Sequence, residues 1–240
     1  MKLPNHKEIE VLTTNPDISG LRILHLSDLH ISKHTPNSFI EELVTLCNGL
    51  EYDIAVITGD IIDCKVSKIK DKLLILNGLR KVFYVSGNHD LVYGLDEMRV
   101  ILSNFTFMDN SSMEFTYNKT AIMLCGLPDR FAMFFGHKRD ENLILEQLSK
   151  SKNSILVAHQ PKDYKFALKS DTPLFLCGHT HGGQIFPFHY IVRLFQPFLS
   201  GLFYKNKTAI YVNKGLGTWG IHARYKADSE ITIIKVQNEY

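Results

Sequence analysis

Eight short runs of β-branched and aromatic residues set the main constraint on how this chain folds. They are spread along the whole sequence: RILHLS (22–27), IAVIT (54–58), VFYVS (82–86), AIMLC (121–125), SILVA (154–158), PLFLC (173–177), AIYVN (209–213) and EITIIKV (230–236). Their apolar character is nearly continuous rather than alternating, which is typical of strands covered on both faces. The runs therefore predict the strands of a layered α/β protein.

Helical patterns fill several of the gaps between these runs. In SFIEELVTLCNGL (38–50), apolar residues recur at helical spacing, and Ser38 and Glu41 stand at the spacing of a capping box. The segments 71–79 and 141–150 have helical patterns as well. Strand–helix–strand alternation followed by strand-rich sequence predicts an α/β protein with either one mixed sheet or two packed sheets.

Composition places the chain among ordinary globular proteins. Of its 240 residues, 45% are hydrophobic and 22% are charged, and no repeat or low-complexity linker divides them, so we expect a single domain over residues 1–240. The net charge of +2 excludes a global field that would favour nucleic acid or an anionic membrane. Four scattered cysteines without a CxxC pair indicate reduced thiols. Residues 1–20 contain no export signal, and no apolar run reaches about 18 residues, so the sequence predicts a cytoplasmic location.

Polar side chains follow five of the predicted strands at the point where each strand ends. They are Asp28-Leu29-His30, Gly59-Asp60, Gly87-Asn88-His89-Asp90, His159 and Gly178-His179-Thr180-His181. Asp, Asn and His bind divalent metals through oxygen and nitrogen. Because ligand sites in open α/β sheets gather at the carboxyl ends of strands, we expect these side chains to share one crevice.

Each of these motifs has a simpler interpretation when it is taken alone. DLH (28–30) and GD (59–60) are common strand-end turns, and GNHD (87–90) suits a loop with side-chain-to-backbone hydrogen bonds. GHTH (178–181), followed by GGQ, is the most specific of them. Their recurrence at five strand ends favours a metal site over five unrelated turns.

In this order and spacing, DLH, GD, GNHD, a lone strand-end His and GHTH resemble the motifs of the calcineurin-like metallophosphoesterase superfamily. The resemblance implies an α/β fold of four layers, an αββα sandwich of two mixed β-sheets flanked by helices. It also implies a dinuclear metal centre at one edge of this sandwich. One metal would be held by Asp28, His30 and His181 and the other by Asn88, His159 and His179, with Asp60 bridging the two.

The resemblance further implies how such a site works. Two divalent cations roughly 3.5–4 Å apart clamp the attacking and leaving oxygens of a phosphoester and make a bridging hydroxide available near neutral pH. The mixed nitrogen and oxygen ligands suit Mn²⁺, Fe²⁺, Co²⁺ or Zn²⁺, among which we favour Mn²⁺. His89 matches the catalytic histidine of the family, which implies that it either protonates the departing oxygen or stabilises charge on the phosphoryl group. Asp90 is expected to orient that imidazole or to support its loop, and a simple loop role stays open.

Two further stretches bear on the substrate. Residues 186–204 are rich in Phe, Leu, Ile and Tyr, and they form either a connection packed on the core or an exposed segment that touches a membrane or cradles acyl chains. GHTHGGQ, with this apolar sequence and NKGLGTWGIHARY (213–225), resembles a branch of membrane-associated phosphohydrolases that includes UDP-2,3-diacylglucosamine pyrophosphatases. Arg224 is expected either to bind a substrate phosphate bidentately or to lie on the surface.

The leading prediction is a dinuclear metal-dependent phosphohydrolase that cleaves a phosphodiester or pyrophosphate bond in a small-molecule substrate, linked to a nucleotide or a lipid. Many relatives in the branch carry an N-terminal membrane helix that this sequence lacks, so any membrane contact is expected to be peripheral, at the inner face, through residues 186–204. A nuclease or cyclic-nucleotide phosphodiesterase is an alternative, although no basic–aromatic stripe supports nucleic-acid binding. A non-catalytic metal-binding scaffold is a third hypothesis. A scaffold that had lost its chemistry should lack some ligands, whereas here all seven ligand positions and His89 are filled. No protein partner follows from the sequence.

Overall fold

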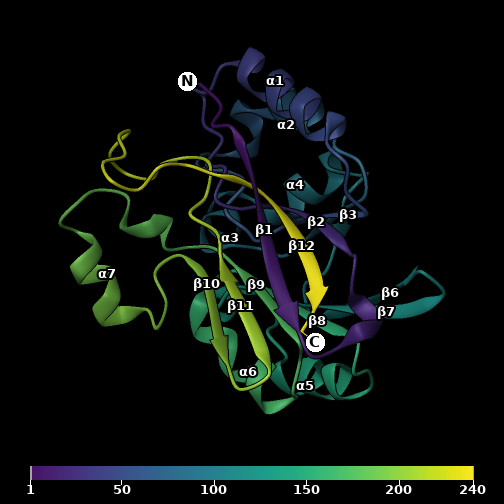
Figure 1. The fold of residues 1–240 in the computed structure, drawn as a ribbon. Helices are drawn as coiled ribbons and strands as arrows, with labels where there is room; N and C mark the ends of the chain where they lie inside the picture. The colour runs from purple at the N-terminus through teal and green to yellow at the C-terminus, as the bar shows by residue number, and fades with distance from the viewer. Residues whose placement is uncertain (1, 240) are drawn as a thin grey trace.

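The computed structural model of the chain describes residues 2–239, which form two mixed six-stranded sheets (Figure 1). The first sheet has the order β1 (His6–Thr13), β12 (Ile231–Asn238), β2 (Arg22–Leu26), β3 (Ile54–Ile57), β4 (Val82–Tyr84) and β5 (Thr106–Phe107). The second has the order β10 (Gly201–Lys205), β11 (Thr208–Val212), β9 (Leu174–Cys177), β8 (Ser154–Ala158), β7 (Thr120–Leu127) and β6 (Ser111–Tyr117). The central strands of both sheets run parallel, whereas β12 is antiparallel to β2, β10 to β11 and β6 to β7.

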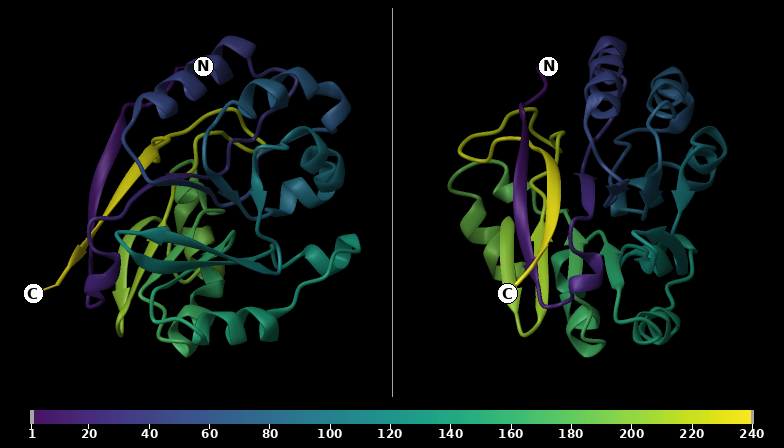
Figure 2. Two further views of the ribbon diagram at one scale, coloured as in Figure 1. Left: turned by 90° about the vertical axis from the view of Figure 1, so that its right-hand side faces the viewer. Right: turned by 45° about the vertical axis from the view of Figure 1, so that its right-hand side comes forward.

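Helices cover the outer face of each sheet (Figures 1 and 2). Over the first sheet lie α1 (Asn37–Gly49), α2 (Lys70–Leu76) and α4 (Leu95–Ile101), and over the second lie α5 (Glu141–Ser149) and α6 (Tyr164–Lys169). The remaining helices are α3 (Asn88–Tyr93), α7 (His189–Phe195) and the short turns η1 (Pro16–Ile18), η2 (Val66–Lys68), η3 (Ala132–Phe135), η4 (Pro161–Asp163) and η5 (His181–Gly183). In Figure 1, α7 stands apart from the two sheets.

The core explains why the strand runs are apolar on both faces. Along β2 and β3, which pair in parallel from Ile23–Ile54 to Leu26–Ile57, alternate side chains belong to different clusters. Ile23 and Ile54 pack in the cluster between the sheets, whereas Leu26 and Ile57 pack against the helices of the first layer. A third cluster joins the outer face of the second sheet to α5 and α6. The predicted four-layer αββα sandwich is therefore confirmed.

All eight predicted strands are present, and the strands that the sequence did not reveal are β1, β5, β6 and β10. β1, β5, β6 and β10 lie at sheet edges and are partly exposed, so their residues carry less apolar signal. The predicted helices at 38–50, 71–79 and 141–150 correspond to α1, α2 and α5. The expected capping box at Ser38 is wrong, because the helix already begins at Asn37 and its N-cap residue is Pro36, without a side-chain cap.

The topology brings the carboxyl ends of parallel strands from both sheets to one edge. Loops after β2, β3 and β4 come from the first sheet, and loops after β8 and β9 come from the second. This edge is where the five predicted polar motifs lie. None of the helices within residues 2–239 is long and apolar enough to cross a membrane.

Candidate metal centre

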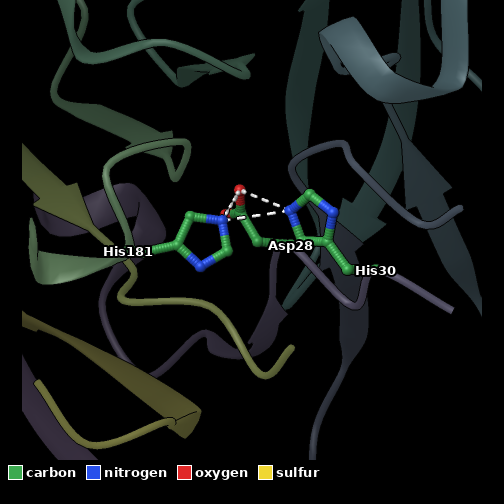
Figure 3. A group of neighbouring side chains, drawn as sticks. All are labelled: Asp28, His30 and His181. Carbon is green, nitrogen blue, oxygen red and sulfur yellow. Dashed lines mark hydrogen bonds and ion pairs between the residues drawn. The ribbon is translucent and has the colours of Figure 1, made fainter. Parts of the chain in front are cut away.

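The first group of predicted ligands joins the ends of two strands from different sheets. Asp28 and His30 follow β2, and His181 begins η5 after β9. Their side chains are buried and converge (Figure 3), with His181 Nε2 lying 3.0 Å from His30 Nε2 and 3.2 Å from Asp28 Oδ1. One carboxylate oxygen and two imidazole nitrogens this close together form a ligand set for a divalent metal.

A second group lies beside the first. Asp60 follows β3, His159 follows β8 and His179 follows β9. His159 Nε2 lies 3.3 Å from Asp60 Oδ2 and 3.1 Å from His179 Nδ1. The same Asp60 oxygen is 3.6 Å from His30 Nε2 of the first group. The Asp60 carboxylate therefore lies between the two groups, within reach of both.

Asn88 and His159 each offer an atom that could bind a metal. The side-chain oxygen of Asn88, at the start of α3, is buried, and no hydrogen-bond donor reaches it from the rest of residues 2–239. A buried amide oxygen without a donor is costly unless a cation or a ligand takes the donor's place. His159 Nδ1 lies 2.6 Å from the Thr58 carbonyl oxygen and donates to it, which leaves the Nε2 lone pair for a metal.

Burial and neighbouring charges together shift the pKa values of the ligand side chains. Burial lowers the pKa of both His179 and His181 to about 4, and the neighbouring His159 adds to this effect at His179. Burial opposes ionisation of Asp28 and Asp60, but the surrounding histidines outweigh it and hold the pKa of both carboxyls below its usual range. At neutral pH, His179 and His181 are therefore neutral and Asp28 and Asp60 are ionised. Burial would lower the pKa of His159, but the Asp60 carboxylate raises it well above its usual range, so a metal that binds there would displace a proton from His159.

The backbone of the site adopts conformations that side chains rarely take. Five predicted ligands have a left-handed backbone with φ between 45° and 71°: Asp28, His30, Asp60, His179 and His181. Such conformations cost free energy and cluster at functional sites. Close packing also requires a glycine at position 178, because a Cβ there would overlap Ser27 Oγ and Asp28 Oδ2.

His89 lies beside both groups and is paired with Asp63. Its Nδ1 is 2.7 Å from Asp63 Oδ1, and its backbone N–H donates to Asp60 Oδ1 over 2.8 Å. Burial alone would lower the pKa of His89, but the hydrogen bond to Asp63 and the nearby Asp60 carboxylate raise it above its ordinary value. Sequence reasoning missed Asp63; the available signal was an acidic residue in the same loop as Asp60, but it matched no expected ligand position.

The Asp90 carboxylate is fully buried and serves the backbone of two loops. It accepts hydrogen bonds from the N–H groups of Asp60, Ile61, Ile62 and Gly87 and from the hydroxyl of Tyr84. Burial and the neighbouring Asp60 raise the pKa of Asp90 to about 6, so the carboxyl is ionised at neutral pH. Of the roles expected for Asp90, these contacts correspond to support of the loops, while Asp63 holds the His89 imidazole.

Arg224 is placed among backbone carbonyls. Its guanidinium lies 3.1 Å from His181 Nδ1 and donates to the carbonyl oxygens of His181, Lys214, Gly215, Gly217 and Ala227. This arrangement ties the GHTH loop to segment 214–227. With its N–H groups engaged in this way, the side chain holds the loop rather than presenting a free fork to a phosphate.

A pocket of about 370 Å³ opens over both ligand groups. Its polar lining includes Asp60, Asn88, His89, His179 and His181. Its apolar lining consists of Phe188, Ile191, Val192 and Phe195, from α7 and the residue before it, and of Trp219. The pocket therefore combines a candidate metal centre with a hydrophobic wall, a composition typical of small-molecule sites.

Comparison with known proteins agrees with this geometry. The sequence profile of calcineurin-like phosphoesterases matches residues 21–183, which include every predicted metal ligand. The chain belongs to this family. This confirms the resemblance inferred from the motifs. An uncharacterized metallophosphoesterase of Helicobacter pylori is 36% identical over 97% of this phosphoesterase chain and 64% of its own length.

Two further similarities concern architecture. A transmembrane protein with metallophosphoesterase domain from Danio rerio is 32% identical over 95% of this phosphoesterase chain and 55% of its own length. The crystal structure of a dimetal phosphatase from Danio rerio has a similar fold, with a TM-score of 0.53 at 10% identity, over 82% of this chain and 88% of that one. The chain thus spans between about half and two thirds of the length of these two sequence relatives.

Proposed function

We propose that this chain is a dinuclear metal-dependent phosphohydrolase that cleaves phosphodiester or pyrophosphate bonds. The observation that carries the proposal is the convergence of Asp28, His30 and His181 beside His159 and His179, with Asp60 between the two groups. Membership of the calcineurin-like phosphoesterase family supports it. The third ligand of the second metal would be Asn88, whose side-chain oxygen is buried and lacks a donor within the described chain.

When bound, two divalent ions supply Lewis acidity at phosphorus and an activated water. The protein side chains supply the rest. His89 lines the pocket, and its hydrogen bond to Asp63 leaves Nε2 as the nitrogen that gives a proton to the departing oxygen. The Asp63 carboxylate, which accepts from His89 Nδ1–H, would stabilise the protonated ring that this step needs. Asp90 holds the loops of Asp60 and Asn88 in place.

Hydrolysis of bis(p-nitrophenyl) phosphate with Mn²⁺ tests this proposal. Asp60→Asn removes the bridging charge, so we expect metal content to fall and turnover to drop by more than about 100-fold. Asp96→Asn, an exposed carboxylate on α4, is the matched control and should behave like the wild type. Wild-type turnover that survives in Asp60→Asn, or metal-loaded protein that cleaves no phosphoester, would contradict the proposal and favour the scaffold.

The hydrophobic wall supports a lipid-linked substrate. The bases of a nucleic acid or a cyclic nucleotide could stack on Phe188 and Phe195 but would leave aliphatic Ile191 uncovered, whereas an acylated phosphoester would cover all three. UMP release from UDP-2,3-diacylglucosamine in detergent, with Asp60→Asn as the blank, tests this choice. Release of UMP in the wild type alone supports it. Cleavage of cyclic nucleotides or oligonucleotides in its place would favour the alternative.

Peripheral membrane contact through residues 186–204 is the second part of this proposal. Every residue of α7 is exposed or half-buried, including Leu194 at 81% and Phe195 at 65% exposure. Residues 172–227 contain six lysines and arginines and no Asp or Glu, so this part of the chain suits an anionic surface. The exposed apolar helix supplies the hydrophobic component of such binding.

Sedimentation with lipid vesicles tests membrane contact without turnover. We expect binding to phosphatidylcholine vesicles that contain phosphatidylglycerol, and at least about tenfold weaker binding for Leu194→Asp because a buried Leu contributes about 1.5–3 kcal/mol. Val100→Asp is the matched control, since Val100 is 80% exposed on α4 in the first helical layer. Equal binding of both variants, or none by the wild type, would overturn the membrane contact.

A further inference from the structure

A second pocket adjoins the pocket over the metal ligands. It has a volume of about 280 Å³ and is lined by the side chains of Ile185, Phe188, Trp219 and Ile221, with the backbone of two glycines, Gly183 and Gly220. Phe188 and Trp219 line both pockets, as do Gly183 and Gln184. The second pocket is thus a continuation of the first past the Phe188 and Trp219 side chains, and no ionisable side chain lines it.

Gln184 holds Trp219 at this boundary. Its side-chain oxygen accepts from the backbone N–H of Trp219 over 3.0 Å. Its amide nitrogen donates to the backbone carbonyl oxygens of Trp219 and Ile221 over 2.9 and 3.0 Å. The Gln184 carbonyl also accepts from the Tyr225 N–H. The residue is buried and has a left-handed backbone with φ of 51°, a costly conformation for a side chain of this size. The loop that carries Trp219 is therefore fixed to the GGQ turn.

The lining of the second pocket selects its occupant. A sugar placed there would give up hydrogen bonds to water that aliphatic and aromatic side chains cannot replace, and the Gln184 amide is already engaged by backbone groups. An alkyl chain would gain from the same transfer. The volume of about 280 Å³ is far larger than a single methyl group needs, which suits an alkyl chain.

We propose that the pocket beyond Trp219 is a subsite for an alkyl chain carried by the phosphoester substrate. Trp219 separates the alkyl chain from the phosphate, which lies over the metal ligands. Gln184 is the residue that positions Trp219. The inference rests on the proposed phosphohydrolase function with a lipid-linked substrate, and it adds the place where an alkyl chain of that substrate binds.

A series of p-nitrophenyl n-alkyl phosphate diesters, from methyl to decyl, tests the subsite at concentrations below aggregation. Burying each methylene group in an apolar site improves binding about fourfold, so kcat/KM should rise about fourfold per carbon until the subsite is full. The rise should appear mainly in KM, because the chain is remote from the reacting bond. A flat series, with the methyl diester cleaved as well as the decyl diester, would overturn the subsite and leave the phosphohydrolase function intact.

The fluorescence of Trp219 provides a readout that does not depend on turnover. Trp219 is the single tryptophan of the sequence, so protein emission comes from the boundary of the proposed subsite. Titration with n-decylphosphonate should shift its emission to shorter wavelength, and methylphosphonate should not. If the emission shifts with n-decylphosphonate but the protein hydrolyses none of the diesters, the subsite is supported and the proposed activity is refuted. The same emission change with both phosphonates, or with neither, would overturn the subsite.

Two substitutions complete the test. Ile221→Asp places a charge in the lining, so the ratio of decyl to methyl kcat/KM should fall at least tenfold, whereas Val100→Asp on α4 should keep the wild-type ratio. Gln184→Ala releases the Trp219 loop, so the fluorescence response to n-decylphosphonate should weaken. A wild-type ratio in Ile221→Asp would show that the chain binds elsewhere.

Discussion

The Asp90→Asn substitution gives the sharpest prediction for the architecture of the site. Asp90 Oδ2 accepts from the N–H groups of Asp60 (2.7 Å) and Gly87 (2.9 Å) and from the Tyr84 hydroxyl (2.6 Å). Asp90 Oδ1 accepts from Ile61 N–H (2.8 Å) and Ile62 N–H (3.1 Å). An asparagine has the same shape but only one acceptor oxygen.

The size of the effect follows from these contacts. The asparagine NH₂ group must take the place of one carboxylate oxygen, and in either orientation it faces two buried backbone N–H groups that lose their acceptor. The Tyr84 hydroxyl can rotate and accept, so it is not counted. Each buried donor left without a partner costs about 1–3 kcal/mol, so the free energy of unfolding should fall by about 2–6 kcal/mol. This is a large part of the 5–15 kcal/mol that holds a typical domain together.

Urea unfolding followed by circular dichroism measures this loss. Tyr84→Phe removes one hydroxyl donor and should cost about 1 kcal/mol. Asp96→Asn, the exposed control, should stay within about 0.5 kcal/mol of the wild type. Asp90→Asn should also bind less metal, since the same carboxylate holds the loops of Asp60 and Asn88. A loss for Asp90→Asn no larger than that for Tyr84→Phe would refute the reasoning.

Three other predictions follow from the site. His89→Gln should lower kcat for bis(p-nitrophenyl) phosphate by about 10²–10⁴-fold with metal content unchanged, and Asp63→Asn should lower kcat less. Loss of metal in His89→Gln would instead assign His89 a role as a metal ligand. Adding Mn²⁺ to chelator-treated protein at 100 times its dissociation constant should raise the free energy of unfolding by about 2.7 kcal/mol for each of the two proposed sites in calorimetry, and no change would argue against a metal centre. Gly178→Ala should displace Asp28 and reduce metal content in elemental analysis, while an exposed Gly136→Ala retains it.

The layered fold was predictable because both faces of its central strands are buried. Ile23 and Leu24 are neighbours in β2, yet one packs between the sheets and the other against the helices, so apolar residues occupy both faces of the strand. The edge strands gave weaker signals. In β1 every residue before Val11 is exposed or half-buried, and its charged residues hide the strand.

The ligand motifs were recognisable because each stands directly at the end of a strand. The supporting contacts were not, since they depend on segments brought together by folding. Gln184 and Trp219 are 35 positions apart, and nothing near either residue in the sequence indicates their pairing. Asp63 lies only three positions after Asp60, but its contact with His89 depends on the approach of the loops after β3 and β4. For Arg224 we expected either a substrate phosphate or solvent as the partner of its guanidinium. Its hydrogen-bond partners include backbone carbonyl oxygens, and a sequence pattern does not show which carbonyls folding will bring near a side chain.

The central claim is that seven side chains hold two divalent metals. Anomalous diffraction at the manganese edge, from crystals grown with Mn²⁺, tests it most directly. The account predicts two peaks, one among Asp28, His30 and His181 and one among Asn88, His159 and His179, with Asp60 in contact with both. A single peak, no peak, or peaks away from the Asp60 carboxylate would contradict it.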